Sequence, residues 1–474
     1  MNTSDMRTVS ASEPRTLVTH PELRSHQSLP FFKTLGEQPK NALERLLSLF
    51  ADVRAGEGVG ALLLATNVFL ILASSYLVRN ARTVLVLTEG RRPFGLSGSE
   101  QQAALSGVMA VILIGLVPLY GWLASRVRRM VLMTTTTLFF AMNLVVFFFL
   151  GGTGLPLGAA FYIWAGIFNL FVLAQFWGFA NDLYTEGQGR RLFPMIGVGA
   201  SLGAVIGAVS IRPLVEYFRF NSFTVMLVAA AVLLLALGVT ALANRRETAH
   251  AEPQAAKTNE EPLGKEGGFS LVLNDRYLMW IGVLVILLNV VNSTGNFLMY
   301  NLVEAHANAI ADLNEKSRYV ALFQGSFDSL VNWVALIAQL FLTSRVIRYL
   351  GVRGSLFVMP LIAFVNYSII AVAPILAIIR IGKVMENSCD YSVQNTLRQA
   401  VFLPTTREAK YKAKAAIDTF GQRTGDVLAA GVVIIGSSML GLSSTILAGL
   451  NVGLTCVWLW VAGQIAKEHK RKTV

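Results

Sequence analysis

Four charged side chains recur at helical spacing inside one apolar stretch of this sequence. Their spacing of three, three and four residues places them on one face of a helix; they are Arg380, Lys383, Glu386 and Asp390. A charge at the centre of a bilayer costs about 2.5–3.5 kcal/mol on insertion scales, so this face is expected to avoid lipid. We predict that Arg380 and Lys383 bind an anionic substrate, with Glu386 and Asp390 as coupling or ion-pairing groups. The structural alternative is an internal ion pair such as Lys383 with Glu386.

Two arginines mark the first apolar segment of the chain. Arg79 and Arg82 are three residues apart, so they share one helix face near an end of that segment. Like charges repel one another unless an anion or carboxylates lie opposite them. We therefore predict that both arginines face a cavity and bind an anionic substrate. The alternative is that both side chains extend to the membrane surface.

Polar side chains also interrupt three later apolar segments. Asn292 and Asn296 are predicted substrate ligands, together with Glu304 near the end of the same segment. Hydrogen bonding between helices is the alternative for the two asparagines. Asp328 and Asp426 are candidates for coupling, because a buried carboxylate is the group that a proton-coupled carrier would use; ion pairing is their other role.

A short polar junction separates two apolar segments between residues 176 and 207. It contains two acids and two arginines, which we predict to form part of a cytoplasmic gate: Asp182, Glu186, Arg190 and Arg191. Charged groups at a helix junction can pair when one side of a transporter closes and separate when it opens.

The elements that must position these residues are membrane helices. Of 474 residues, 54% are hydrophobic and only 14% are charged, against roughly 25% charged in typical soluble domains. Twelve apolar runs are long enough to cross a bilayer as helices, near residues 59–87, 102–125, 131–151, 157–182, 193–212, 222–243, 277–301, 319–344, 354–373, 375–395, 414–437 and 443–466. We predict an all-α polytopic membrane protein with twelve transmembrane helices in two six-helix halves.

A polar linker divides the twelve runs six and six. The predicted organisation is a mostly disordered cytoplasmic tail with one candidate interfacial helix, two bundles joined by a cytoplasmic linker, and a basic cytoplasmic tail: 1–57, 58–244, 245–270, 271–466 and 467–474. Most lysines and arginines outside the runs lie on the side of the two termini, which predicts that both termini are cytoplasmic. A weak internal repeat follows the second run of each half, at Ser125–Arg129 and Ser344–Arg348, as in parallel repeats.

The sequence contains no P-loop, no HExxH and no paired-cysteine motif. We therefore predict no enzyme activity, no metal and no cofactor. The net charge of +12 is distributed over short loops, which favours a topological role over nucleic-acid binding. The expected partners are a small anionic substrate and the lipid bilayer, and the expected assembly is a monomer. Gly199, Gly203 and Gly207 recur every four residues and predict close helix packing.

Five stretches resemble the ATP/ADP translocase family of plastids and obligate intracellular bacteria. They touch both halves: VRNARTVLVLT (Val78–Thr88), FWGFAN (Phe176–Asn181), RRLFPMIGVGAS (Arg190–Ser201), NLVE (Asn301–Glu304) and KYKAKAAID (Lys410–Asp418). The resemblance implies a fold like that of major-facilitator proteins and exchange of nucleotides across a membrane. It also implies that Arg82 stands at the basic position of the first span, in place of a lysine, and that Glu304 stands at a retained acidic position.

Two positions depart from the pattern of that family. Ala165 stands where the family has an acidic group in the fourth span, and Asp426 stands where it has a lysine in the eleventh. ATP is strongly anionic, and phosphate recognition depends on Arg and Lys. The loss of one cation and the gain of one acid therefore weaken the expectation that ATP is the substrate.

These observations together predict an alternating-access secondary transporter that exchanges nucleotides of the ATP/ADP type or a related anionic solute. The alternative is a proton-coupled symporter or exporter of a non-nucleotide solute. A non-transporting sensor on the same fold is a third option, against which the four charges near residue 385 argue. The acidic residues Asp5, Glu13 and Glu22 are unlike a transit peptide, so a bacterial inner membrane is the expected location.

Overall fold

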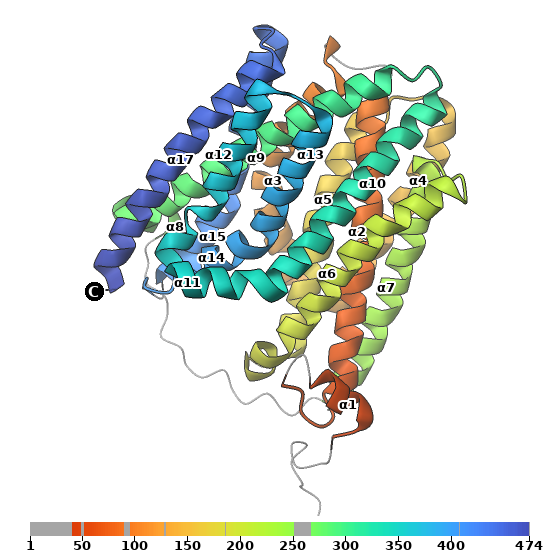
Figure 1. The fold of residues 1–474 in the computed structure, drawn as a ribbon. Coiled ribbons are helices and arrows are strands. Elements are labelled where there is room, and N and C mark those ends of the chain that lie inside the picture. Colours follow the sequence, from red (N-terminus) through yellow and green to blue (C-terminus); the bar gives the residue numbers. More distant parts are fainter. Residues whose placement is uncertain are drawn as a thin grey trace, which may run out of the picture.

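The computed structural model describes residues 40–48, 52–89, 95–127, 129–184, 186–250, 267–406 and 408–473, and these residues form helices and connecting turns without strands (Figure 1). The first half contains α1 (Ala42–Leu47), α2 (Gly58–Thr88), α3 (Gly98–Arg126), α4 (Arg129–Leu150), the 3₁₀ turn η3 (Gly151–Thr153), α5 (Gly158–Leu183), α6 (Glu186–Glu216) and α7 (Ser222–His250).

The second half contains both α-helices and short π-helical segments. The α-helices are α8 (Gly268–Asn274), α9 (Arg276–Asn308), α10 (Leu313–Ile337), α11 (Thr343–Ser355), α12 (Val358–Val372), α13 (Leu376–Cys389), α14 (Asn395–Ala400), α15 (Lys414–Ala416), α16 (Gln422–Val433) and α17 (Ser444–Thr473). The π-helical segments are η4 (Ala338–Leu342), η5 (Asp390–Gln394), η6 (Ala409–Ala413), η7 (Ile417–Gly421) and η8 (Ile434–Met439).

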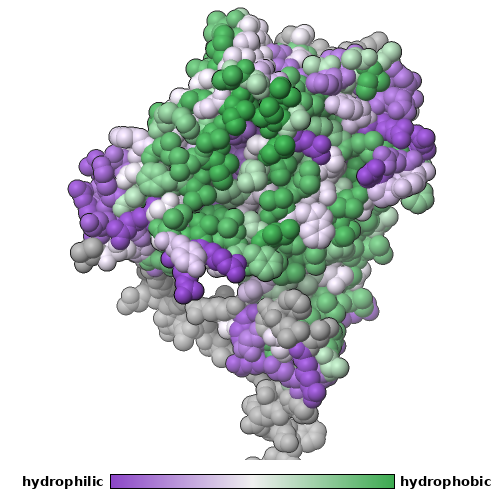
Figure 2. Space-filling view, viewed as in Figure 1, coloured by the Kyte–Doolittle hydropathy of each residue, from purple (hydrophilic) through white to green (hydrophobic). Residues whose placement is uncertain are grey.

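The helices have the length and the surface of membrane spans. Within the described residues, nine helices are long and apolar enough to cross a bilayer. The other three predicted spans are the shorter α12 and two rods that π-helical segments divide, α13–η5–α14 and η6 to η8. Figure 2 shows a broad hydrophobic surface with hydrophilic residues gathered toward its ends. The predicted architecture of twelve spans in two halves of six is confirmed.

Glycines let two helices of the first half approach closely. A Cβ atom at Gly199, Gly203 or Gly207 of α6 would clash with the backbone of α2, at Phe69 in the case of Gly203. Small residues at this spacing are typical of tight helix packing in membranes. The close packing that the glycine spacing predicts is therefore present, and it fixes α2 against α6.

The two halves meet along helices that carry the predicted polar residues. The helix α10 packs against α2 and α6, and α3 packs against α9 and α16. We call the end of the bundle where α2 begins and α17 finishes the proximal end, and the end where α2 and α9 finish the distal end. In Figure 1, α1 and the C-terminus both lie at the lower, proximal end.

The segment before α2, where the sequence predicts a candidate interfacial helix, contains the short helix α1. The helix α1 ends at Leu47, and Val53 is fully buried. Glu44 is also buried, and its carboxylate accepts hydrogen bonds from the backbone N–H groups of Asn41 and Gly56, at 2.9 and 2.7 Å. These contacts dock the segment onto the first turn of α2.

Candidate functional site

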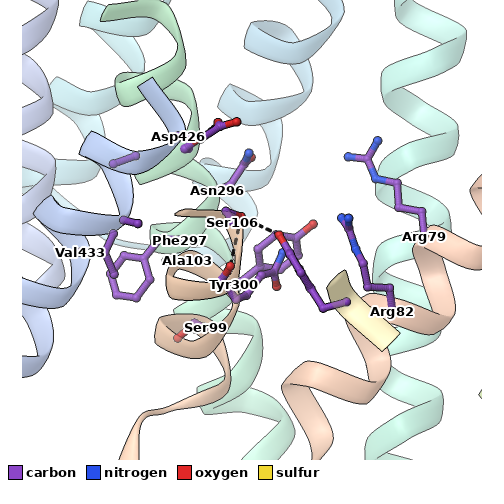
Figure 3. A pocket seen from close by; sticks show the side chains of 15 residues that line it. Arg79, Arg82, Ser99, Ala103, Ser106, Asn296, Phe297, Tyr300, Asp426 and Val433 are labelled. Carbon is purple, nitrogen blue, oxygen red and sulfur yellow. Dashed lines mark hydrogen bonds between the residues drawn. The ribbon is translucent and has the colours of Figure 1, made fainter. Parts of the chain in front are cut away.

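A cavity of about 190 Å³ lies between the two halves. Five helices line it, and three of them do so with residues at i, i+3, i+4 and i+7, which is one helix face. The lining residues are Arg79 and Arg82 of α2; Ser99, Gln102, Ala103 and Ser106 of α3; Tyr162 of α5; Ser293, Asn296, Phe297 and Tyr300 of α9; and Asp426, Ala429, Ala430 and Val433 of α16. Figure 3 shows ten of these residues labelled.

Arg79 forms an ion pair with an acid of the opposite half. Its guanidinium lies 3.6 Å from a carboxylate oxygen of Asp328, whose side chain is buried on α10. Gln324 donates to that carboxylate at 2.7 Å, and Tyr300 donates to the Gln324 carbonyl at 2.8 Å. This chain of contacts joins α2, α10 and α9, and it neutralises the charge of Arg79.

Arg82 has a different environment. Its guanidinium lies over the ring of Tyr162, 4.5 Å from the ring centroid, which is a cation–π arrangement. The Tyr162 hydroxyl is 2.6 Å from the hydroxyl of Ser106, so the ring is held in place. The Nε of Arg82 is buried without a hydrogen-bond partner, and no carboxylate in the described residues lies within ion-pair distance of this arginine. Arg82 is therefore the cation of the cavity that is available to a ligand.

Asp426 lies on the other side of the cavity from the two arginines, next to Asn296 (Figure 3). Its carboxylate is 3.4 Å from Arg423 of the same helix, and Ser293 of α9 donates to it at 3.4 Å. Both contacts are long for charge-assisted hydrogen bonds, which are usually about 2.7–2.9 Å. The carboxylate can therefore accept a shorter hydrogen bond from a ligand.

The predicted stripe of four charges lies away from this cavity. Lys383 and Glu386 are fully buried and 3.2 Å apart. The ammonium of Lys383 also donates to Asn292, and the Tyr367 hydroxyl donates to Glu386 at 2.9 Å. The geometry matches the alternative of an internal ion pair, formed within α13 and hydrogen-bonded to its neighbours α9 and α12. Roles of Asn292, Lys383 and Glu386 in binding or coupling stay predictions.

The other two charges of the stripe also have protein neighbours. Arg380 donates to the Ser326 hydroxyl at 2.9 Å and lies over the ring of Phe323, 5.3 Å from its centroid. Asp390 begins the π-helical segment η5, and its Oδ1 is buried without a hydrogen-bond partner. Neither residue lines the cavity between the halves, so their predicted roles also stay predictions.

Carboxylates connect the two halves at the distal end. Glu304 of α9 is buried and accepts hydrogen bonds from the backbone N–H groups of Gly98 and Ser99, at 2.7 and 2.8 Å. These N–H groups belong to the first turn of α3, where the partial positive charge of the helix N-terminus favours an anion. In the other direction, Ser437 donates to Glu100 at 2.7 Å. Glu304 thus caps a helix of the opposite half and does not line the cavity; substrate binding by Glu304 stays a prediction.

The predicted gate residues lie near the proximal end. Arg191 forms an ion pair with Glu57 at 2.8 Å. Burial alone would raise the pKa of the Glu57 carboxyl, but the hydrogen bonds and charge of Arg191 lower it below its ordinary value of 4.5. Asp182 is exposed, and the side chains of Glu186 and Arg190 lie outside the described residues. The acid that pairs with Arg191 therefore comes from the turn before α2, which the sequence analysis did not single out.

Sequence reasoning also missed most of the neutral side chains around the cavity. Ser99, Gln102 and Ser106 recur at i, i+3 and i+7 along α3, so their polar stripe was a usable signal. Tyr162 and Tyr300 gave no such signal, because aromatic residues on an apolar helix are equally common in a packed core.

Comparison with known proteins gives the chain a family and a fold. The family model described as TLC ATP/ADP transporter matches residues 159–469. The ADP,ATP carrier protein 1 of Chlamydia muridarum is 24% identical over 352 residues, which cover 65% of this chain and 64% of that protein. The ADP,ATP carrier protein 4 of Rickettsia prowazekii is 25% identical over 354 residues, which cover 65% of this chain and 67% of that protein. The match thus spans about two thirds of the length of these relatives.

Two solved structures share the arrangement of helices. The nucleoside transporter NupG has a TM-score of 0.60 at 14% identity and covers 84% of this chain and 98% of its own. The peptide transporter POT in complex with sulfate has a TM-score of 0.61 at 14% identity and covers 90% of this chain and 99% of its own. At this identity the likeness concerns the fold alone, and the fold is major-facilitator-like.

Proposed function

This chain belongs to the TLC ATP/ADP transporter family, and on that premise we propose that it exchanges nucleotides or a related anionic solute across a membrane. The observation that carries the proposal is the cavity between the halves, on one wall of which the described residues leave Arg82 without an ion pair. A guanidinium fork suits phosphate and carboxylate groups. Transport at this site needs no catalytic residue, metal or cofactor.

The mechanism that we propose is alternating access, in which the halves move around the cavity. The ligand binds Arg82 and competes with Asp328 for Arg79. The distal contacts of Glu304 and Glu100 hold that end closed, and they must separate before a ligand can leave there. Arg191 and the other predicted gate residues would act at the proximal end through contacts made in another conformation, because the ion pair of Arg191 with Glu57 lies within the first half.

The orientation and location belong to the same proposal. We propose that both termini are cytoplasmic and that the protein lies in a bacterial inner membrane as a monomer, with the domain boundaries given in the sequence analysis. The concentration of Lys and Arg at the proximal end supports this orientation.

Uptake into vesicles that contain the purified protein tests this function. The labelled probes are AMP, ADP and ATP, and the vesicles are either empty or preloaded with unlabelled nucleotide. We expect uptake only into preloaded vesicles and its loss in Arg82→Ala, because the cavity then lacks its available cation. Arg212→Ala is the matched control, since Arg212 pairs with Glu216 on the exposed surface of α6. No uptake of any nucleotide by folded protein would refute nucleotide exchange.

A second candidate function is proton-coupled transport of a non-nucleotide solute. The observation that favours it is a carboxylate in the cavity wall, Asp426, with a further buried acid, Asp328, behind Arg79. Accumulation driven by an imposed pH gradient in vesicles without counter-substrate, lost in Asp426→Asn, would support this function. Strict dependence on internal nucleotide would exclude it.

A further inference from the structure

The charges around the cavity leave a single net positive charge. Arg79 is neutralised by Asp328, and Asp426 is balanced by Arg423, both through the ion pairs described above. Among the charged side chains that line the cavity, only Arg82 forms no ion pair within the described residues. The remaining polar groups of the lining, which are hydroxyls and amides, carry no charge. The cavity can therefore compensate about one negative charge on a ligand.

The charges are also separated across the cavity. Arg82 belongs to α2 on one wall, whereas Asp426 belongs to α16 on the other, and Figure 3 shows them on opposite sides. A chain of phosphates that extends from Arg82 would approach the carboxylate of Asp426, and juxtaposed like charges oppose binding. A hydrogen-bond donor at that position would bind instead, because the long contacts of Asp426 leave acceptor capacity.

Aromatic side chains also line the cavity. Tyr162, Phe297 and Tyr300 contribute rings to its lining. Aromatic side chains provide stacking surfaces for a nucleobase, and each stacked base is worth roughly 1–3 kcal/mol in single-strand binding proteins. A carboxylate accepts hydrogen bonds from an exocyclic amino group of a base. The volume of about 190 Å³ lies below the roughly 300–1,000 Å³ of pockets for drug-sized ligands, so each additional phosphate would require the cavity to open further.

From these observations we propose that the cavity selects a nucleoside monophosphate that carries an exocyclic amino group, rather than a nucleoside di- or triphosphate. The phosphate binds Arg82, the base lies among the aromatic rings, and its amino group donates to Asp426. The proposal rests on the function proposed above and specifies its substrate.

Binding to the purified full-length protein tests the selection, with titration calorimetry at constant ionic strength and AMP, ADP, ATP and inosine monophosphate as probes. We expect AMP to bind at least about tenfold more tightly than ATP, because the cavity compensates about one negative charge and additional phosphates would lie near the carboxylate of Asp426. Inosine monophosphate, which has a carbonyl in place of the amino group, should bind more weakly than AMP. In Asp426→Asn the ratio of ATP to AMP affinity should rise about tenfold, whereas Asp418→Asn, outside the cavity lining, should leave it unchanged.

The possible results separate this inference from the function on which it rests. If ATP binds as tightly as AMP, the selection is overturned while nucleotide exchange stands. If inosine monophosphate binds as tightly as AMP, the assignment of Asp426 as the acceptor for the amino group is overturned. If no nucleotide binds to folded protein, both proposals fail. The four probes on the unmodified protein give these outcomes even if Asp426→Asn does not fold.

Discussion

The intramembrane charges of this protein have two kinds of environment, and the second half contains both. In the first half, Arg79 and Arg82 extend from α2 into the cavity between the halves. In the second half, Asp426 also lines the cavity, whereas Lys383 and Glu386 form an ion pair enclosed in their own bundle. A charge that faces the cavity can contact a ligand there, whereas a pair enclosed within one half mainly stabilises that half.

The helices of the two halves also differ in their regularity. The described helices of the first half contain no π-helical segment, and glycines fix α6 tightly against α2. The described residues of the second half contain five such segments, η4 to η8. One of them begins at the charged residue Asp390, and another contains Asp418. Because π-helical turns often mark functional sites in helices, we infer that the second half deforms during transport while the first half moves as a rigid unit.

The largest expected effect concerns the enclosed pair of the second half. Glu386→Ala leaves the ammonium of Lys383 buried without its counter-charge. Breaking a buried ion pair in this way costs about 3–5 kcal/mol, so the thermal unfolding midpoint of the purified protein should fall sharply. The double variant Lys383→Met with Glu386→Leu should recover part of the loss, because it removes both charges. A small effect of Glu386→Ala would contradict the enclosed role of the pair.

An intermediate effect is expected where the first half is most tightly packed. In Gly203→Ala the new methyl group would clash with the backbone at Phe69. Overpacking of this kind typically costs about 1–3 kcal/mol, measurable as a lower unfolding midpoint. Gly238→Ala on α7 is the matched control, since open space surrounds that position. Equal midpoints for the two variants would show that α6 can move away from α2, and the rigid first half would have to be abandoned.

The sequence was sufficient for the architecture and for part of the site. Apolar length predicts the twelve helices, and the three-residue spacing of Arg79 and Arg82 predicts their common face, which lines the cavity. Spacing alone does not determine whether a charged helix face lines the cavity or packs inside its own half. The stripe from Arg380 to Asp390 has the same helical regularity, yet its central pair lies within one half because α9 and α12 contact Lys383 and Glu386. Nothing in the local residue types predicts the π-helical segments, which depend on tertiary packing.

The smallest expected effect compares the proximal ends of the two halves. Arg191 lowers the pKa of Glu57 in the first half, so this ion pair contributes stability that is fully present above the ordinary value of 4.5 and is lost as pH falls through the lowered pKa. Glu57→Gln should therefore lower the unfolding midpoint at neutral pH and reduce its further decline below pH 4.5. In the second half Asp275 pairs with Lys472 at 2.8 Å, but both side chains are one third exposed. Exposed pairs contribute little, so Asp275→Asn should follow the unmodified protein at both pH values. If the two variants respond alike, the difference between the proximal ends is one of exposure and not of stability.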